Sequence, residues 1–227
     1  MELIYPASNT LQRLLLRLFA DWQVTGRENV PPMGPLVIVC NHLSNLDASL
    51  LGASLPSRRI RFLAKSGLFT ASAVGGWFLR SYGAFPLNRE GVDVRAYRWA
   101  LNELATDGAL VLFPEGTRSR GAMARAKQGV VNIVLKSGAP ILPVGITGTE
   151  QTGHWIDVLH PTGTIRVNVG QVFSLPGIEG KPSKELLESL TTSIMLRIAE
   201  LLPESYRGVY SDLTGRTGTP LAESVEQ

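Results

Sequence analysis

Short apolar runs alternate along the chain with segments of helical periodicity. The apolar runs predict strands at 36–40, 60–64, 83–87, 109–113, 140–146 and 164–170. Residues three or four positions apart predict helices over 9–22, up to about 55, 66–80, 92–106, 122–137 and 184–202. Because most of the strand segments carry apolar residues at nearly every position, both faces of the sheet should be covered. The pattern predicts an α/β fold, with a mostly buried mixed sheet flanked by helices.

The first predicted helix is amphipathic. One face carries Leu11, Leu14, Leu15, Leu18 and Trp22, and another carries Arg13 and Arg17. Such a helix fits the plane of a bilayer interface, and it fits docking on the protein core equally well. We therefore divide the chain into an N-terminal amphipathic helical segment (1–25), an α/β domain (26–210) and a loose C-terminal tail (211–227).

Composition excludes disorder, and no stretch of the sequence is an obvious membrane-spanning helix. Hydrophobic residues make up 44% of the chain, charged residues 18%, and the mean hydropathy is +0.10. The most apolar stretch, 66–79, lies between Lys65 and Arg80 and is shorter than the roughly 20 residues that a spanning helix needs. An interfacial or re-entrant helix and a buried core helix both remain open for it. The N-terminus shows no secretory signal pattern.

Charge is distributed unevenly. The net charge is +3, and residues 1–100 carry 11 Lys and Arg against 6 Asp and Glu. Such a basic half favours phosphates or lipid headgroups as partners. Nucleic acid is not expected, because no aromatic residues alternate with these charges. The single cysteine, Cys40, excludes an internal disulfide and a cysteine-built zinc site. We expect no metal.

The first candidate site follows the strand at 36–40, where the sequence continues NHLSNLD. In α/β sheets, ligands bind beyond the carboxyl ends of the strands, which places His42 where an active site is expected. A tight turn would bring the carboxylate of Asp47 to the far ring nitrogen of His42 and form a general-base pair. Alternatively, Asp47 caps the following helix.

Two further segments follow strands in the same way. After the strand at 109–113, the sequence PEGTRS offers Glu115, Thr117 and Arg118, and exposed amides around Gly116 could bind phosphate. After the extended segment 83–87, Arg89 is a candidate for a second phosphate contact. Taken singly, either segment fits an ordinary turn with surface charge.

Taken together, these segments resemble the PlsC-type glycerolipid acyltransferases, the lysophosphatidate acyltransferase family. The resemblance extends from about Gly26 to Gly148. Its four motifs match at Asn41, His42 and Asp47, at Gly83, Phe85 and Arg89, at Phe113 to Ser119, and at Ala139 to Gly145, with Lys127 and Gly129 matching positions after the third motif. The third motif, FPEGTRS, is met without departure.

The resemblance implies direct acyl transfer from a thioester to a glycerol hydroxyl, with His42 as base and Asp47 as its partner. It implies 1-acylglycerol-3-phosphate as acceptor, phosphatidate as product, and acyl-CoA or acyl carrier protein as co-substrate, without a cofactor. Acceptor contacts are implied for Arg89, Glu115, Gly116, Thr117, Arg118, Lys65 and Phe85. The expected location is the cytoplasmic face of a membrane, peripheral or monotopic. We also expect an apolar groove for the acyl chain, lined by segment 66–79.

Other interpretations stay open. A serine hydrolase would use Ser44, although no G-x-S-x-G elbow is present. Cys40, with His42 as its base, is another candidate nucleophile. A non-catalytic lipid-binding protein is a third interpretation. Glycerol-3-phosphate, another lysophospholipid or a lyso-ornithine lipid are alternative acceptors.

Overall fold

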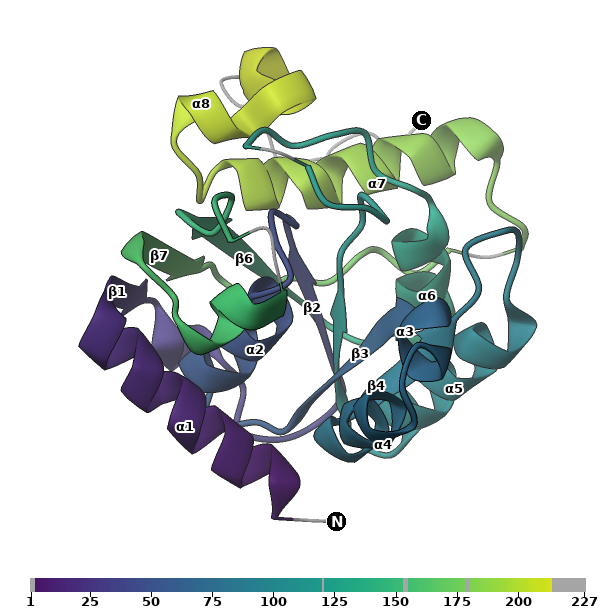
Figure 1. Cartoon of the computed structure of the whole chain (residues 1–227). Coiled ribbons are helices and arrows are strands. Elements are labelled where there is room, and N and C mark those ends of the chain that lie inside the picture. Colours follow the sequence, from purple (N-terminus) through teal and green to yellow (C-terminus); the bar gives the residue numbers. More distant parts are fainter. Residues whose placement is uncertain (1–2, 120, 153–154, 179, 214–227) are drawn as a thin grey trace.

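The residues that the structure describes, 3–119, 121–152, 155–178 and 180–213, contain one mixed sheet of seven strands in this computed structural model (Figure 1). The strands are β1 (Ala20–Thr25), β2 (Leu36–Cys40), β3 (Ile60–Lys65), β4 (Ala84–Leu87), β5 (Ala109–Leu112), β6 (Ile141–Thr147) and β7 (Gly163–Val169). Their order is β1-β7-β6-β2-β5-β3-β4, and neighbours are parallel except β6 and β7. The predicted α/β fold with a buried mixed sheet is confirmed.

Helices cover both faces of this sheet (Figure 1). They are α1 (Ile4–Phe19), α2 (Asp47–Ser54), α3 (Gly67–Thr70), α4 (Ala73–Tyr82), α5 (Val94–Ala105), α6 (Gly129–Ser137), α7 (Lys184–Ala199) and α8 (Glu204–Arg207), with 3₁₀ helices η1 (Arg27–Asn29), η2 (Trp155–Leu159) and η3 (Gly208–Leu213). Neighbouring residues of β2 belong to different hydrophobic cores, one on each face of the sheet. Ile38 belongs to the core with α1, α2 and α4, and Val39 belongs to the core with α5, α6 and α7. This alternation across the strand explains why β2 is apolar at every position.

The N-terminal segment differs from the prediction. Its helix ends at Phe19, and residues 20–25 form an edge strand that pairs with β7 through residues about 140 positions later. The exposure of β1 alternates along the strand, and Asp21 bonds to the cross-strand Arg166 with an Oδ2–Nη2 distance of 2.6 Å. Within segment 1–25, Ile4–Phe19 is therefore helical and Ala20–Thr25 belongs to the sheet.

Two other predicted helices are interrupted. Segment 66–80 divides into α3 and α4, because the side chain of Ser72 accepts a hydrogen bond from Gly75 N and starts a new helix. Residues 122–128 are not helical. Their backbone amides bond elsewhere, with Met123 N on Tyr206 O and Lys127 N on Pro114 O. Most of the predicted tail, 214–227, lies outside the described residues.

Candidate active site

Four parallel strands deliver the predicted site residues to one edge of the sheet. Because β2, β5, β3 and β4 are consecutive parallel neighbours, their carboxyl ends lie side by side. His42 follows β2, the 113–119 segment follows β5, Lys65 ends β3, and Arg89 follows β4. The order along the edge puts the basic residues of β5, β3 and β4 on one side of His42.

His42 and Asp47 form a hydrogen-bonded pair. The Nδ1 atom of His42 lies 2.8 Å from Oδ2 of Asp47, and the two side chains are 15% and 0% exposed. The imidazole also stacks on Phe113, with ring centroids 4.1 Å apart and planes inclined by 21°. Contact with Asp47 fixes the tautomer that carries its proton on Nδ1, so Nε2 is the nitrogen that can accept a proton from a substrate.

The side chain of Asp47 accepts hydrogen bonds from the turn before α2 and does not cap that helix. Within the described chain, it accepts five hydrogen bonds. Oδ2 receives His42 Nδ1, Leu43 N (2.7 Å) and Ser44 N (2.9 Å), while Oδ1 receives Ser44 Oγ (3.2 Å) and Thr149 Oγ1 (2.7 Å). The amides belong to the turn before α2, so the carboxylate organises the loop that carries His42.

Both alternative nucleophiles, Ser44 and Cys40, are buried, and the hydroxyl of Ser44 is also hydrogen-bonded. The hydroxyl of Ser44 donates to Asp47 and accepts from Leu46 N at 3.1 Å, and the residue is fully buried. Cys40 is also fully buried. Burial raises the pKa of its thiol well above the ordinary value, and the negative charges of Asp47 and Glu115 add to the effect. Neither side chain has the exposure that a covalent intermediate requires.

Glu115 faces the protein rather than the edge of the sheet. The residue is 2% exposed, and its two carboxylate oxygens accept hydrogen bonds from His42 N (3.0 Å) and Ala124 N (2.8 Å). Burial raises the pKa of this carboxyl group, and the bonds from Ala124, His42 and Ser119 oppose that shift. Ser119 returns a backbone bond to His42 O at 2.7 Å. The loop after β5 thus bonds to both backbone polar groups of His42, because Glu115 accepts from its N–H and Ser119 N donates to its carbonyl oxygen.

Gly116, Thr117 and Arg118 form the outer part of this loop. Gly116 has φ +70°, a conformation that favours glycine. A Cβ there would also lie only 3.0 Å from Cδ of Lys127, so close packing favours glycine as well. Thr117 and Arg118 are exposed. Arg118 donates from Nη1 to Oδ1 of Asn45 at 3.0 Å and so connects the loop after β5 with the loop after β2.

The remaining predicted residues lie further along the edge. Lys65 and Arg89 are exposed at the ends of β3 and β4, where Lys65 is opposite Leu87 in the register. The ring of Phe85 stacks on Trp99 of α5, with centroids 4.7 Å apart and an angle of 13°, and Phe85 also lines a pocket with Ser66 and Asn88. Phe85 therefore packs α5 against β4.

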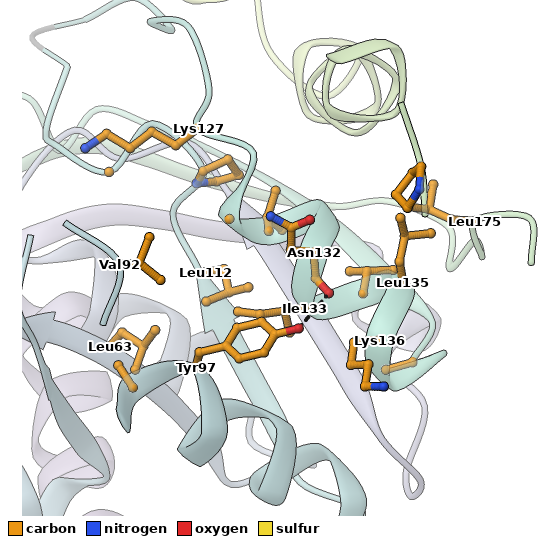
Figure 2. A pocket seen from close by; sticks show the side chains of 18 of the residues that line it. Leu63, Val92, Tyr97, Leu112, Lys127, Asn132, Ile133, Leu135, Lys136 and Leu175 are labelled. Atoms are coloured by element: carbon orange, nitrogen blue, oxygen red, sulfur yellow. Dashed lines mark hydrogen bonds between the residues drawn. The ribbon is translucent and has the colours of Figure 1, made fainter. Parts of the chain in front are cut away.

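An apolar groove of about 1010 Å³ starts beside the pair and continues between α5 and α6. Phe113, which stacks on His42, is part of its lining. Figure 2 shows Leu112, Ile133 and Tyr97 along the groove, with Lys127 and Lys136 far apart from one another. Segment 66–79 is not part of this lining, although its Ser66 lines a second pocket together with Phe85. The segment lies instead on the opposite face of the sheet, where Phe69 joins the core of α1, α2 and α4.

The family model named Acyltransferase matches residues 21–147. This range contains every predicted site residue and more than half of the chain. The chain belongs to the acyltransferase family.

Relatives of this acyltransferase include proteins named for one activity. It is 28% identical over 189 residues to the 1-acyl-sn-glycerol-3-phosphate acyltransferase of Bacillus subtilis (strain 168), covering 83% of this chain and 92% of that protein. It is 37% identical over 152 residues to the chloroplastic enzyme BAT2 of Brassica napus, of the same name, covering 64% of this chain and 41% of that one.

A solved structure agrees with the PlsC-type resemblance. The crystal structure of the 1-acyl-sn-glycerophosphate acyltransferase PlsC from Thermotoga maritima superposes with a TM-score of 0.67 and 27% identity, over 87% of this chain and 78% of that one. The similarity therefore extends beyond the matched motifs to most of the fold.

Two contacts of the pair in this acyltransferase were missing from the sequence prediction. Phe113 was noted only as part of a motif, and its stacking on His42 depends on the register of β2 against β5. Thr149 was not singled out. Its position after the apolar strand β6, which is a parallel neighbour of β2, is the signal that points to the same edge.

Proposed function

We propose that this protein transfers a fatty acyl group from an acyl thioester to the free hydroxyl of 1-acylglycerol-3-phosphate, giving phosphatidate. The observation that carries the proposal is the His42–Asp47 contact of 2.8 Å at the carboxyl edge of the sheet. Two relatives are named for this reaction, and the similar crystal structure is of a PlsC. The donor is an acyl-CoA or an acyl carrier protein.

The reaction needs a base and correct positioning, because a thioester is already activated. Nε2 of His42 takes the proton from the acceptor hydroxyl as its oxygen attacks the carbonyl carbon. The negative charge of Asp47 stabilises the imidazolium that forms. When the tetrahedral intermediate collapses, the C–S bond breaks, and the leaving thiolate takes the proton back from His42. Acyl ester and free thiol are the products, and no acyl-enzyme forms.

Basic side chains on one side of His42 support a phosphate-bearing acceptor. Arg118, Lys65 and Arg89 follow β5, β3 and β4, which are consecutive neighbours in the sheet. All three are exposed. A guanidinium group binds phosphate through paired hydrogen bonds, and several such contacts would orient the glycerol hydroxyl toward Nε2.

The acceptor is tested with a panel that contains lysophosphatidate, glycerol-3-phosphate and a lyso-ornithine lipid, with both donors. We expect the highest kcat/KM for lysophosphatidate, and we expect Arg118→Ala to raise its KM by about tenfold or more. Arg98→Ala, an exposed arginine within α5 away from the edge, serves as the matched control. Preference for the lyso-ornithine lipid, which lacks the phosphate, would keep the chemistry and reject this acceptor.

The groove between α5 and α6 is proposed to hold an acyl chain. Ile133 lies halfway along α6, a helix about 14 Å long. Ile133→Trp would fill the groove, so the ratio of palmitoyl to decanoyl transfer should fall by about tenfold, since each buried methylene contributes about 0.8 kcal/mol. Ile133→Val opens space and should leave the ratio nearly unchanged. An unaltered ratio in Ile133→Trp would place the acyl chain elsewhere.

Attachment to a membrane surface is proposed from the orientation of α1. Its inward face carries Tyr5, Asn9, Gln12 and Leu16, whereas Leu11, Leu14 and Leu18 point outward and are 50%, 51% and 63% exposed. The inward polar groups are bonded: Tyr82 Oη donates to Asn9 Oδ1 at 2.5 Å, and Gln12 Nε2 donates to Val158 O at 3.2 Å. A helix that buries polar groups and exposes leucines is inverted relative to an ordinary surface helix.

The neighbouring helix α4 also carries exposed apolar side chains. These two helices contact each other, and Val74, Trp77 and Phe78 of α4 are 74%, 52% and 41% exposed. Within the described residues, no helix is both long and apolar enough to cross a bilayer. We infer that this surface, Leu11, Leu14, Leu18, Val74, Trp77 and Phe78, lies in the interface of the cytoplasmic leaflet.

Vesicle sedimentation tests this attachment. The wild-type protein should sediment with anionic vesicles of phosphatidylglycerol and phosphatidylethanolamine at low salt. Replacing Leu11, Leu14 and Leu18 together by serine should lower the partition coefficient by about a hundredfold or more, because each buried leucine contributes about 1.5–3 kcal/mol. Leu186→Ser, at an exposed leucine of α7, is the control. A wild-type protein that stays in the supernatant contradicts the attachment.

A further inference from the structure

Thr149 contacts the carboxylate partner of His42 from the far side of the pair. It follows β6, 102 residues after Asp47 in the sequence, and its Oγ1 donates to Oδ1 of Asp47 at 2.7 Å. Both residues are fully buried. Residue 149 also lies beyond the range that the family model matches. The contact therefore comes from the packing of β6 against β2 and not from any of the motif segments that carry His42.

The turn that holds Thr149 has a fixed conformation. Gly148 has φ +85°, and a Cβ there would lie 1.9 Å from Thr164 O, so only glycine fits. Gly148 N donates to one oxygen of Glu150 at 3.0 Å, and Tyr206 Oη of α8 donates to the other at 2.7 Å. The turn that places the Thr149 hydroxyl against Asp47 is therefore held by hydrogen bonds of Glu150, one of them from Tyr206 in the C-terminal segment.

We propose that Thr149 is a positioning residue for the acyl transfer, acting through Asp47. This inference rests on the proposed function. Oδ2 of Asp47 faces His42, and Oδ1 faces Thr149, so the short bond on Oδ1 fixes the rotation of the carboxylate plane. The other hydroxyl on Oδ1, Ser44 Oγ, is longer at 3.2 Å and also accepts from Leu46 N. Thr149 is therefore the stronger donor to this oxygen, and hydrogen bonds to a buried charge are strong ones.

The test compares Thr149→Val, which removes the hydroxyl at constant shape, with Thr149→Ser, which keeps it. We expect Thr149→Val to lower kcat by about ten- to a hundredfold and to change KM for either substrate by less than about twofold. Thr149→Ser should retain most of the wild-type kcat. Thr191→Val is the matched control, because Thr191 is equally a buried threonine with a 2.7 Å bond, made to Leu187 O inside α7.

A double-mutant cycle separates positioning from general packing. In the Asp47→Asn background, Thr149→Val should lower kcat by less than about threefold further, because the carboxylate through which it acts is gone. A full additional loss in that background, or equal losses in Thr149→Val and Thr149→Ser, would overturn the proposal. So would a kcat of Thr149→Val within about twofold of wild type. If the valine variant does not fold, Thr149→Ala removes the same hydroxyl and replaces it in the comparison with Thr149→Ser.

A measurement without substrate keeps this inference distinct from the proposed function. We expect the proton between His42 Nδ1 and Asp47 to give a low-field resonance in proton NMR spectra of the free protein. We expect this resonance to shift or broaden in Thr149→Val and to remain in Thr191→Val. A wild-type protein without acyl transfer activity would overturn the proposed function alone, whereas an unchanged resonance in Thr149→Val would overturn the role of Thr149.

Discussion

Replacement of His42 by alanine should lower kcat for phosphatidate formation by about 10²- to 10⁴-fold, the usual contribution of a positioned general base. Nε2 of His42 is the atom that receives the hydroxyl proton. The two buried side chains beside it, Ser44 and Cys40, offer no replacement base. The imidazole is partly exposed and its backbone is held by Glu115 and Ser119. The variant should therefore fold and still bind vesicles.

The measurement is the initial rate with palmitoyl-CoA and lysophosphatidate in detergent micelles, beside circular dichroism of each protein. His160→Ala is the control, because His160 is an exposed histidine whose ring stacks on Phe19 of α1. A rate for His42→Ala within about threefold of the wild-type rate would remove His42 from the chemistry.

Asp47→Asn should lower kcat by about 10²-fold or more while leaving the fold intact. Two of the donors on Oδ2, Leu43 N and Ser44 N, are backbone amides that cannot turn away, so the amide oxygen of asparagine must take that position. Its NH₂ group then faces the hydroxyls of Ser44 and Thr149, which can rotate to accept. His42 keeps its tautomer but loses the charge that stabilises the imidazolium.

Stability measurements check this orientation. Urea unfolding should show a loss of about 1–3 kcal/mol for Asp47→Asn, because charge-assisted hydrogen bonds are replaced by neutral ones. Asp47→Ala should lose more, since it leaves the amides of Leu43 and Ser44 without their acceptor. Equal stability of the two variants would mean that asparagine does not occupy the predicted orientation, and wild-type kcat in Asp47→Asn would contradict the pair.

The central part of the fold follows from sequence patterns because its strands are buried on both faces. β2, β5 and β6 are buried at every position, and each stands before a polar turn, so the edge of the sheet and the location of His42 are predictable. The contact with Asp47 is also predictable, since a turn of five residues leaves few arrangements in which that carboxylate remains satisfied.

Other features depend on contacts between residues that are distant in the sequence. β1 is an edge strand that pairs only with β7, and the apolar Trp22 within it fits a helical period as well as a strand. From the motif, Glu115 is predicted to contact the acceptor substrate. Its burial depends on hydrogen bonds from His42 N and from Ala124 N in the loop at 122–128, and the sequence does not show these bonds. Thr149 reaches Asp47 only through the pairing of β6 with β2.

The orientation of α1 shows a further limit of periodicity. The leucine face is visible in the sequence, but periodicity does not say whether that face turns inward or outward. The bonds of Asn9 with Tyr82 and of Gln12 with Val158 O decide the matter, because they fix the polar side of the helix against the protein. The buried side of α1 thus carries Asn9 and Gln12, and Leu11, Leu14 and Leu18 lie on the exposed side.

Formation of phosphatidate is the most direct test of the proposed activity. Purified protein is mixed with radiolabelled lysophosphatidate and with palmitoyl-CoA or palmitoyl acyl carrier protein, and the lipids are separated by chromatography. We predict labelled phosphatidate with at least one donor from the wild-type protein, and almost none from His42→Ala. Absence of phosphatidate with both donors, or equal formation by His42→Ala, would contradict acyl transfer by the His42–Asp47 pair.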